Sequence, residues 1–325
     1  MTQTAHWLGV DLGGTKMLAA LYDGAFALVA ERKEKTKGQA GPQAVLDRLQ
    51  QLISDTLKDA GVSLKNLDGL GLGVPGPVNI ETGAVLSAPN LGWRNLSLQG
   101  LLERACHCPV RVYNDVDAGT YGEYRFGAGR QKRCVIGLFP GTGIGGGCIY
   151  EGKIFSGTQH SCFEVGHLRV VPEGRLCGCG RRGCLEAHAS RLAIAADVAA
   201  AAYRGQAPAL LKLAGTELRD IKSRTLAKAI AAGDQAVEEI VRRAARQLGL
   251  TAAGLVNLLA PDVIILGGGL VEALGDLYLE EVRSAVERRA MPLLGDTVKI
   301  RVAQLGDHAT ALGAAALVAA ACARH

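Results

Sequence analysis

The segment from His167 to Cys184 restricts the possible fold more than any other part of the chain. It places one histidine and three cysteines, Cys177, Cys179 and Cys184, within eighteen residues, with glycines at positions 178, 180 and 183. Zinc prefers four nitrogen or sulfur ligands in a tetrahedron, and glycine permits the tight turns that bring such ligands together. We therefore predict a zinc-binding loop, with reduced structural thiols as the alternative.

Two other interpretations of this cluster are weaker. Cys177 and Cys179 are too close in sequence to form a comfortable disulfide, and three cysteines leave one over. The spacing C-x-C-x4-C also differs from that of a zinc finger that reads nucleic acid, and no ββα unit follows it. The other cysteines are scattered along the chain, which is typical of a reducing compartment. We expect a structural metal in a cytoplasmic protein.

The size and charge of the chain narrow its class. Its 325 residues are enough for two domains that each have a core. The 36 Lys and Arg residues against 31 Asp and Glu residues give a net charge of +5, without the basic run of a nucleic-acid-binding tail. No signal peptide opens the sequence, and apolar helical stretches such as 309–323 are too short or too alanine-rich to span a membrane. We expect no nucleic-acid partner and no membrane partner.

Strand patterns and helix patterns alternate along the sequence, which is typical of an α/β fold. We expect the first three strands, which are separated by short glycine-containing turns, to form a meander, and the alternation as a whole to give a largely parallel sheet packed by helices. The predicted strands lie at 7–12, 16–22, 25–33, 70–74, 110–113, 262–266 and 298–302, with two more within 134–155 across a glycine-rich turn. The predicted helices lie at 41–60, 98–105, 185–203, 225–232, 234–259, 277–289 and from 307 onward.

Three glycine-rich turns follow apolar strands: DLGGTK at 11–16, PGTGIGGG at 140–147 and ILGGG at 265–269. Successive backbone amides in such turns can form a concave site for an anion. A hairpin turn would explain any one of them, but it explains all three together poorly. None matches the P-loop pattern or the dinucleotide-binding fingerprint, so we expect a phosphate ligand that is held in another way.

Acidic and amide side chains stand at the ends of two predicted strands. Asp11 ends the first strand beside a glycine turn, where its carboxylate could hold hydrated Mg²⁺ over phosphates, or simply cap the turn. Asn114 and Asp115 end another strand, and side chains at that position face the crevice of an open α/β sheet. Asp115 could accept a proton from a hydroxyl group there. The alternative is an N-cap for the following helix.

Glu164, His167 and Glu186 bracket the cysteine cluster. Zinc on one imidazole nitrogen would fix the ring and leave the other nitrogen to hydrogen-bond a ligand. Carboxylates around a small polyol suit sugar hydroxyls, which need several oriented acceptors. We therefore predict that the metal fixes a sugar-binding loop.

Together these motifs resemble those of the ROK family, which comprises bacterial sugar kinases and related repressors. The motifs, in chain order, are DLGGTK, PGPV, PNLGW at 89–93, NDVDAG at 114–119, GTGIGGG, E-x-G-H at 164–167 and CGCGRRGCLE. They cover nearly the whole chain, and the last two are the most specific. The resemblance implies an actin-like ATPase fold of the hexokinase type, which is ribonuclease H-like, with two α/β domains around a cleft. It implies a smaller N-terminal domain of residues 1–117 plus 305–325, and a larger C-terminal domain of 118–304 with the zinc-binding loop.

The resemblance also implies roles for individual residues, with ATP, Mg²⁺ and a structural Zn²⁺ as cofactors. Asp115 matches the catalytic base that takes the proton of the sugar's 6-hydroxyl. The residues that match sugar ligands are Gly76, Asn90, Asn114, Asp115, Glu164, His167 and Glu186. The residues that match phosphate and nucleotide loops are Asp11, Gly13, Gly14, Thr15 and Lys16, then Gly141, Thr142 and Gly143, then Gly267 and Gly268. The residues that match zinc ligands are His167, Cys177, Cys179 and Cys184.

The implied activity is ATP-dependent phosphorylation of a hexose at the 6-hydroxyl, with glucose as the leading substrate, by a homodimer or homotetramer. N-acetylglucosamine, N-acetylmannosamine and fructose are alternative substrates that share every catalytic motif. A second class is the sugar-sensing ROK regulator without catalytic activity. Such repressors carry a winged helix-turn-helix ahead of the first strand, and about six residues precede Trp7 here. Polyphosphate is a weaker candidate donor, because polyphosphate-using relatives often lack the cysteine cluster.

The chain departs from the family pattern just before Glu164. Many family kinases have small residues there, whereas this chain has Ser161, Cys162 and Phe163. A phenylalanine at this position is expected to reshape the sugar pocket, so sugar specificity does not follow from the resemblance.

Overall fold

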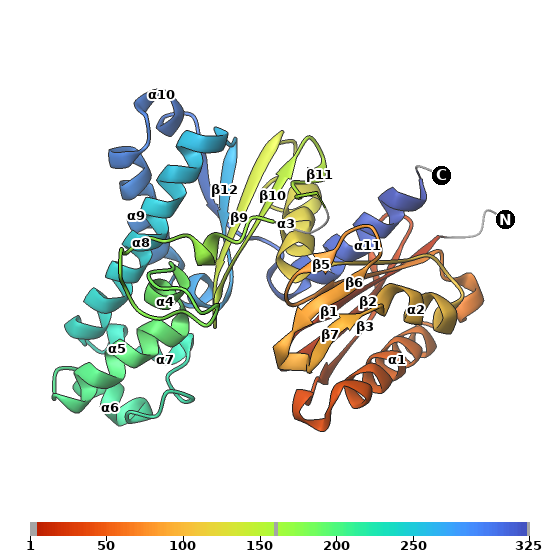
Figure 1. The fold of residues 1–325 in the computed structure, drawn as a ribbon, viewed down its shortest axis with the longest axis horizontal. Coiled ribbons are helices and arrows are strands. Elements are labelled where there is room, and N and C mark those ends of the chain that lie inside the picture. The colour runs from red at the N-terminus through yellow and green to blue at the C-terminus, as the bar shows by residue number, and fades with distance from the viewer. Residues whose placement is uncertain (1–4, 159–161, 324–325) are drawn as a thin grey trace. The chain divides into compact units, whose positions relative to one another are not determined.

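A computed structural model describes residues 5–158 and 162–323 (Figure 1). Ser161 therefore lies outside the described residues. The chain forms two compact units. The first contains Met1–Gln131, Gly147–Phe163 and Asp307–His325, and the second contains Lys132–Gly146 and Glu164–Gly306. The domain limits given above stay a prediction.

The first unit is built on a five-stranded mixed sheet. Strands β1, β4 and β8 run parallel to one another, whereas β2 pairs antiparallel with both β1 and β3. The meander expected for the first three strands is confirmed, because the short connections between them can join only antiparallel neighbours. The sheet order is β3 (Leu28–Lys35), β2 (Lys16–Asp23), β1 (His6–Leu12), β4 (Gly69–Val74) and β8 (Val110–Asn114).

The sequence of β4, GLGLGV, gives this sheet two different faces. Its larger residues alternate with glycines, and side chains alternate between the faces of a strand. Leu70 and Leu72 belong to the buried cluster shared with α1 (Pro42–Asp59) and α2 (Leu98–Cys106). On the other face a Cβ atom at Gly71 would overlap the backbone of α11 (Ala309–Cys322). The glycines therefore let this helix lie almost on the sheet backbone.

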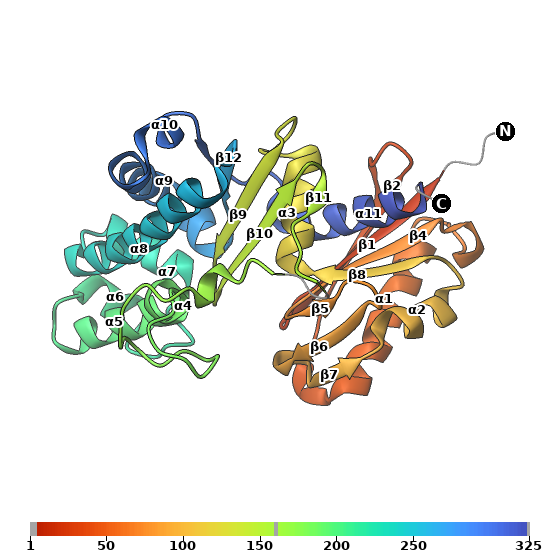
Figure 2. The same ribbon diagram turned by 45° about the horizontal axis from the view of Figure 1, so that its top comes forward.

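Helix α3 (Asp115–Phe126) packs beside α11 in both views (Figures 1 and 2). A Cβ atom at Gly122 would overlap the carbonyl oxygen of Ala309, and one at Gly313 would overlap that of Ala118. Two glycines therefore set the close approach of these helices and fix the start of α3. The remaining elements of this unit are η1 (Gly38–Ala40), η2 (Leu64–Asn66), η3 (Pro89–Leu91), β11 (Lys153–Ile154) and a three-stranded sheet of β5 (Val78–Asn79), β6 (Ala84–Ala88) and β7 (Trp93–Leu96), which was not predicted.

A second five-stranded sheet has the order β11-β10-β9-β12-β13, with β9, β12 and β13 parallel. Its strands besides β11 are β9 (Cys134–Pro140), β10 (Ile144–Tyr150), β12 (Val263–Leu266) and β13 (Lys299–Val302). The helical elements that follow in sequence are η4 (Val165–His167), α4 (Glu186–Ala189), α5 (Arg191–Tyr203), α6 (Pro208–Ala214), α7 (Ser223–Ala231), α8 (Gln235–Leu259), α9 (Gly269–Arg289), α10 (Pro292–Gly295) and η5 (Gly306–His308).

One predicted helix was wrong in this part. The helix expected over 185–203 is divided at Ser190, whose hydroxyl caps α5 by accepting a hydrogen bond from the amide of Ala193. The helix expected over 277–289 forms the second part of α9, whose backbone is non-helical at Leu274, and a short helical segment that was not predicted begins at Gly269 directly after the glycine turn. Among the described residues, no helix combines the length and apolar character that a membrane crossing requires.

Candidate active site and metal centre

Three predicted segments meet at one edge of the first sheet. Because β1, β4 and β8 are parallel neighbours, their carboxyl ends lie on the same side. Asp11 lies near the end of β1, Gly76 follows β4, and Asn114 is the last residue of β8. The Asn114 Nδ2 atom donates a hydrogen bond to the carbonyl oxygen of Gly76 at 3.1 Å, which ties two of these segments together.

Asn114 is the N-cap of α3. Its Oδ1 atom accepts hydrogen bonds from the amides of Val116 at 2.9 Å and Asp117 at 3.1 Å. The alternative interpretation of Asp115 as this cap was therefore wrong. Asp115 is instead the first helical residue and is half-buried, and its backbone oxygen accepts a hydrogen bond from Thr310 Oγ1 at 3.2 Å. Helix α11 thus helps to position the predicted base.

The carboxyl group of Asp11 lies in an acidic environment. Burial, and then the nearby Asp115, raise the pKa of Asp11 from 3.8 to about 7; Asp307 acts in the same direction and Lys16 opposes it. Lys16 Nζ contacts both Asp307 carboxylate oxygens, at 2.9 and 2.8 Å, and this bond lowers the pKa of Asp307. Carboxylates that mutually oppose ionisation suit a hard divalent cation such as Mg²⁺.

The backbone of the first glycine loop is hydrogen-bonded to Thr36, which is fully buried. The Thr36 hydroxyl donates to the carbonyl oxygen of Gly13 at 2.6 Å, and the Thr36 amide donates to that of Thr15 at 2.9 Å. The amides of Gly14 and Thr15 donate to no group in the described part of the chain. The loop therefore keeps two backbone donors for a ligand while the carbonyl oxygens of Gly13 and Thr15 are satisfied.

The second glycine loop, in the other unit, is shaped by Arg191 at the start of α5. The Arg191 amide donates to the carbonyl oxygen of Gly141 at 2.8 Å, and its guanidinium donates to Thr142 Oγ1 at 3.0 Å. Within the loop, the Gly141 amide donates to the carbonyl oxygen of Gly143 at 2.8 Å. The Thr142 hydroxyl accepts from Arg191, so its own proton remains available for a phosphate oxygen.

Gly267 and Gly268 form the third loop, after β12, which runs parallel to β9. Their loop and the Gly141 loop therefore follow the carboxyl ends of neighbouring strands. Gly268 is the N-cap of α9 and has φ of 77°, a left-handed conformation that favours glycine. The first turn of α9 offers backbone amides to an anion, and the helix is interrupted at Leu274, whose backbone is non-helical.

Glu186 connects the metal loop to the second glycine loop. Its Oε2 atom accepts a hydrogen bond from the amide of Ile144 at 2.9 Å, and a Cβ atom at Gly143 would overlap that oxygen. From the other direction, a Cβ atom at Gly166 would overlap the carbonyl oxygen of Ile144. The 164–167 turn and Glu186 therefore both pack on the first residue of β10.

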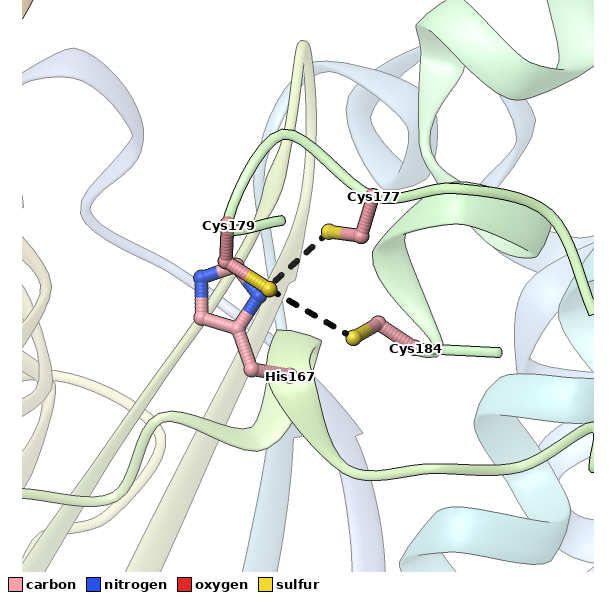
Figure 3. Close-up of side chains that lie close together, drawn as sticks. All are labelled: His167, Cys177, Cys179 and Cys184. Atoms are coloured by element: carbon pink, nitrogen blue, oxygen red, sulfur yellow. Dashed lines mark hydrogen bonds between the residues drawn. The ribbon is translucent and has the colours of Figure 1, made fainter. Parts of the chain in front are cut away.

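The predicted zinc ligands come together in the structure (Figure 3). His167 Nδ1 lies 3.6 Å from Cys177 Sγ, Cys179 Sγ lies 3.7 Å from Cys184 Sγ, and all four ligand atoms lie within 4.8 Å of one another. A tetrahedron with Zn–S bonds of ~2.3 Å has edges of about 3.7 Å. All nine cysteines are free thiols. The distances and the donor set fit zinc, with His167 Nδ1 as the nitrogen ligand.

The comparisons with known proteins agree with this geometry. The chain matches the model of the ROK family over residues 7–321 and belongs to that family. Its fold is the actin-like ATPase fold predicted above. A glucokinase of Halalkalibacterium halodurans is 33% identical over 96% of this chain and 94% of the relative. The crystal structure of a ROK family glucokinase from Streptomyces griseus in complex with glucose and AMPPNP has a TM-score of 0.82, with 34% identity, over 97% of this chain and 98% of that chain. A xylose repressor of Caldicellulosiruptor bescii is 30% identical over 96% of this chain and 77% of the repressor.

The predicted site residues divide between the two units. The first unit contains Asp11, Gly13, Gly14, Thr15, Lys16, Gly76, Asn90, Asn114 and Asp115. The second contains Gly141, Thr142, Gly143, Glu164, His167, Cys177, Cys179, Cys184, Glu186, Gly267 and Gly268. The sequence analysis missed Thr36, Arg191 and Asp307, which act through contacts with residues far away in the chain and carry no motif of their own. Phe163 has φ of 73°, which is uncommon for a bulky residue.

Proposed function

We propose that the protein is a sugar kinase that transfers the γ-phosphoryl group of ATP to the 6-hydroxyl of a hexose, with glucose as the leading substrate. The observation that carries this proposal is the position of Asp115, at the carboxyl edge of the sheet beside Asp11 and the first glycine loop. The glucokinase relatives, one of them solved with glucose and AMPPNP, support the same reaction.

Asp115 accepts the proton of the attacking hydroxyl. Its backbone is fixed by α3 and α11, so the carboxylate is held in place before the sugar binds, as a general base requires. Asn114 keeps one N–H of its amide for the sugar after bonding to Gly76. With His167 Nδ1 directed at the metal, Nε2 is left to bond a hydroxyl. The other proposed sugar ligands are Gly76, Asn90, Glu164 and Glu186.

The glycine loops position the phosphates. Gly14 and Thr15 supply amides, Lys16 supplies positive charge, and the Gly141–Gly143 loop supplies the Thr142 hydroxyl. The Gly267–Gly268 loop holds the nucleotide side at the start of α9. Mg²⁺ near Asp11 would neutralise charge on the phosphates, which is the main contribution a metal makes to phosphoryl transfer. Zn²⁺ on His167, Cys177, Cys179 and Cys184 would stabilise the loop that carries Glu186.

The remaining parts of the proposal concern the state of the protein in the cell. We place it in the cytoplasm, where nine free thiols stay reduced. We expect a homodimer or homotetramer, a state that analytical ultracentrifugation would measure directly.

A second candidate function is a sugar-sensing regulator. It is favoured by the xylose repressor, which is 30% identical to the chain over 77% of the repressor's length. The presence of a positioned carboxylate at Asp115 favours the kinase, since a sensor has no need of a proton acceptor.

A coupled ADP-release assay with Mg-ATP tests the proposal. Glucose, fructose, mannose, N-acetylglucosamine and N-acetylmannosamine are compared with a reaction that lacks sugar, and the Asp115→Asn variant is the matched control. We expect sugar-dependent turnover that is greatest with glucose. Turnover of another hexose would show a different sugar specificity, and Phe163 would then be the residue to test as its cause. Calorimetric binding of a sugar without turnover of any would favour the regulator.

A further inference from the structure

A cavity of about 240 Å³ lies beside the first glycine loop, entirely within the first unit. It is lined by Gly14, Thr15, Lys35, Lys37, Gly38 and Asn90. Gly14 and Thr15 were assigned above to phosphate binding and Asn90 to sugar binding. Lys35 and Lys37 have no role in the reaction described so far.

The cavity wall is anchored on both sides. Between the two lysines, the buried Thr36 bonds to the carbonyl oxygens of Gly13 and Thr15 through its hydroxyl and its amide. A Cβ atom at Gly38 would overlap the carbonyl oxygen of Asn90, so the backbone after Lys37 lies against the Asn90 turn. The segment that carries the lysines is therefore attached to both the phosphate loop and the sugar-side turn.

Several donor groups of the cavity lining are not bonded to any acceptor in the described residues. In the described ranges neither Lys35 nor Lys37 forms an ion pair, whereas Lys16, which lies opposite Lys35 in the β2–β3 register, forms one with Asp307. The amides of Gly14 and Thr15 also have no acceptor in those ranges. Two ammonium groups and two backbone amides around one cavity suit an oxyanion such as phosphate.

We propose that this cavity binds the phosphate group of the phosphorylated sugar, with Lys35 and Lys37 as its charged ligands. The assignment rests on the proposed function, because it takes Asn90 as a sugar ligand. Phosphate donors and a sugar-side amide share one cavity, and a hexose 6-phosphate is the molecule that carries both matching groups. The cavity then retains the product and makes the enzyme sensitive to product inhibition.

Calorimetric titrations with glucose 6-phosphate, glucose, inorganic phosphate and Mg-ATP test this assignment. They compare the parent protein with a double variant, Lys35→Ala with Lys37→Ala. The control is Lys33→Ala, which removes an equally exposed positive charge from the same strand but does not line the cavity. We expect glucose 6-phosphate to bind at least about tenfold more weakly to the double variant, glucose to bind equally, and the control to match the parent. Arginine at both positions should restore most of the affinity.

Several outcomes would overturn the assignment. Equal losses for glucose and glucose 6-phosphate would indicate damage to the sugar site, and thermal unfolding of each variant would identify a folding defect. An equal effect of Lys33→Ala would indicate general electrostatics without a local site. Weaker Mg-ATP binding alone would assign the lysines to the donor. If no sugar is turned over, the proposed function fails separately, whereas loss of inorganic phosphate binding in the double variant would still support the anion site.

Discussion

Replacing Asp11 with asparagine should stabilise the folded protein more at pH 8 than at pH 5. Burial and the neighbouring Asp115 raise the pKa of Asp11 from 3.8 to about 7. Between these two values the folded protein keeps a proton that the unfolded chain has released. Because the folded state binds more protons there, its stability falls as the pH rises through this window, and it falls no further above the folded pKa. Asparagine removes this loss.

The size of the effect follows from the width of the window. From pH 5 to pH 7 the folded state loses about 1.36 kcal/mol per pH unit, which gives about 2.7 kcal/mol over two units. Protein atoms surround the carboxyl group, yet Asp11 keeps part of its surface exposed, so water reduces the penalty. We take about half, so the gain from Asp11→Asn should be about 1.4 kcal/mol larger at pH 8 than at pH 5.

Urea unfolding of the parent and the variant at both pH values measures this difference, in buffer without added Mg²⁺ because a bound cation would hold the carboxylate ionised. Two further variants test the cause. The Asp115→Asn variant removes the neighbouring negative charge, so its free energy of unfolding should depend less on pH than that of the parent. The Lys16→Met variant removes the opposing positive charge, so its free energy of unfolding should depend more on pH. The reasoning is refuted if Asp11→Asn changes the free energy of unfolding equally at both pH values.

Three other predictions concern the base, the metal and the helix contact. Asp115→Asn should lower kcat by at least about a hundredfold while the calorimetric sugar affinity changes less than about twofold; near-parent turnover would exclude it as the base. Cys179→Ser should lower zinc content, measured by atomic emission, and weaken sugar binding; unchanged binding after metal loss would contradict the coupling. Gly313→Ala should cost about 1–3 kcal/mol in urea unfolding, because its Cβ overlaps Ala118. Gly254→Ala, with no neighbouring atom within 4 Å, should instead stabilise by about 0.5–1 kcal/mol.

The order of strands and helices was predictable because hydrophobic periodicity is local. The first three strands, α1 and α8 lie within a few residues of the predicted ranges. The glycine face of β4 was not predictable, since Gly71 weakens a strand by its local propensity and is explained only by the helix it meets, which comes more than two hundred residues later. The antiparallel pairing of the first three strands was predictable, because the turns between them are too short for a parallel crossover.

The residues of the candidate site were also predictable only in part. The zinc ligands were predictable because their spacing alone restricts the chemistry, and the glycine loops because three of them follow strands. The cap of α3 was considered only at Asp115, as the alternative to its role as the base, because Asn and Asp both cap helices and only the structure shows that Asn114 accepts from the amides of Val116 and Asp117. The role of Arg191 was not predictable, because an arginine at a helix start is common and only the structure shows its guanidinium 3.0 Å from Thr142 Oγ1.

The position of Ile144 gives the metal a wider role than holding its own loop. Cys184 lies two residues before Glu186, and Glu186 bonds to the Ile144 amide that follows the Gly141–Gly143 loop. The carbonyl oxygen of the same residue is covered by Gly166, inside the turn that carries the metal ligand His167. One peptide segment is therefore held from both sides by elements that a metal bound at His167 and the three cysteines would join. Loss of the metal should loosen a sugar-side carboxylate and a phosphate loop together, so the affinities for sugar and nucleotide should fall in parallel.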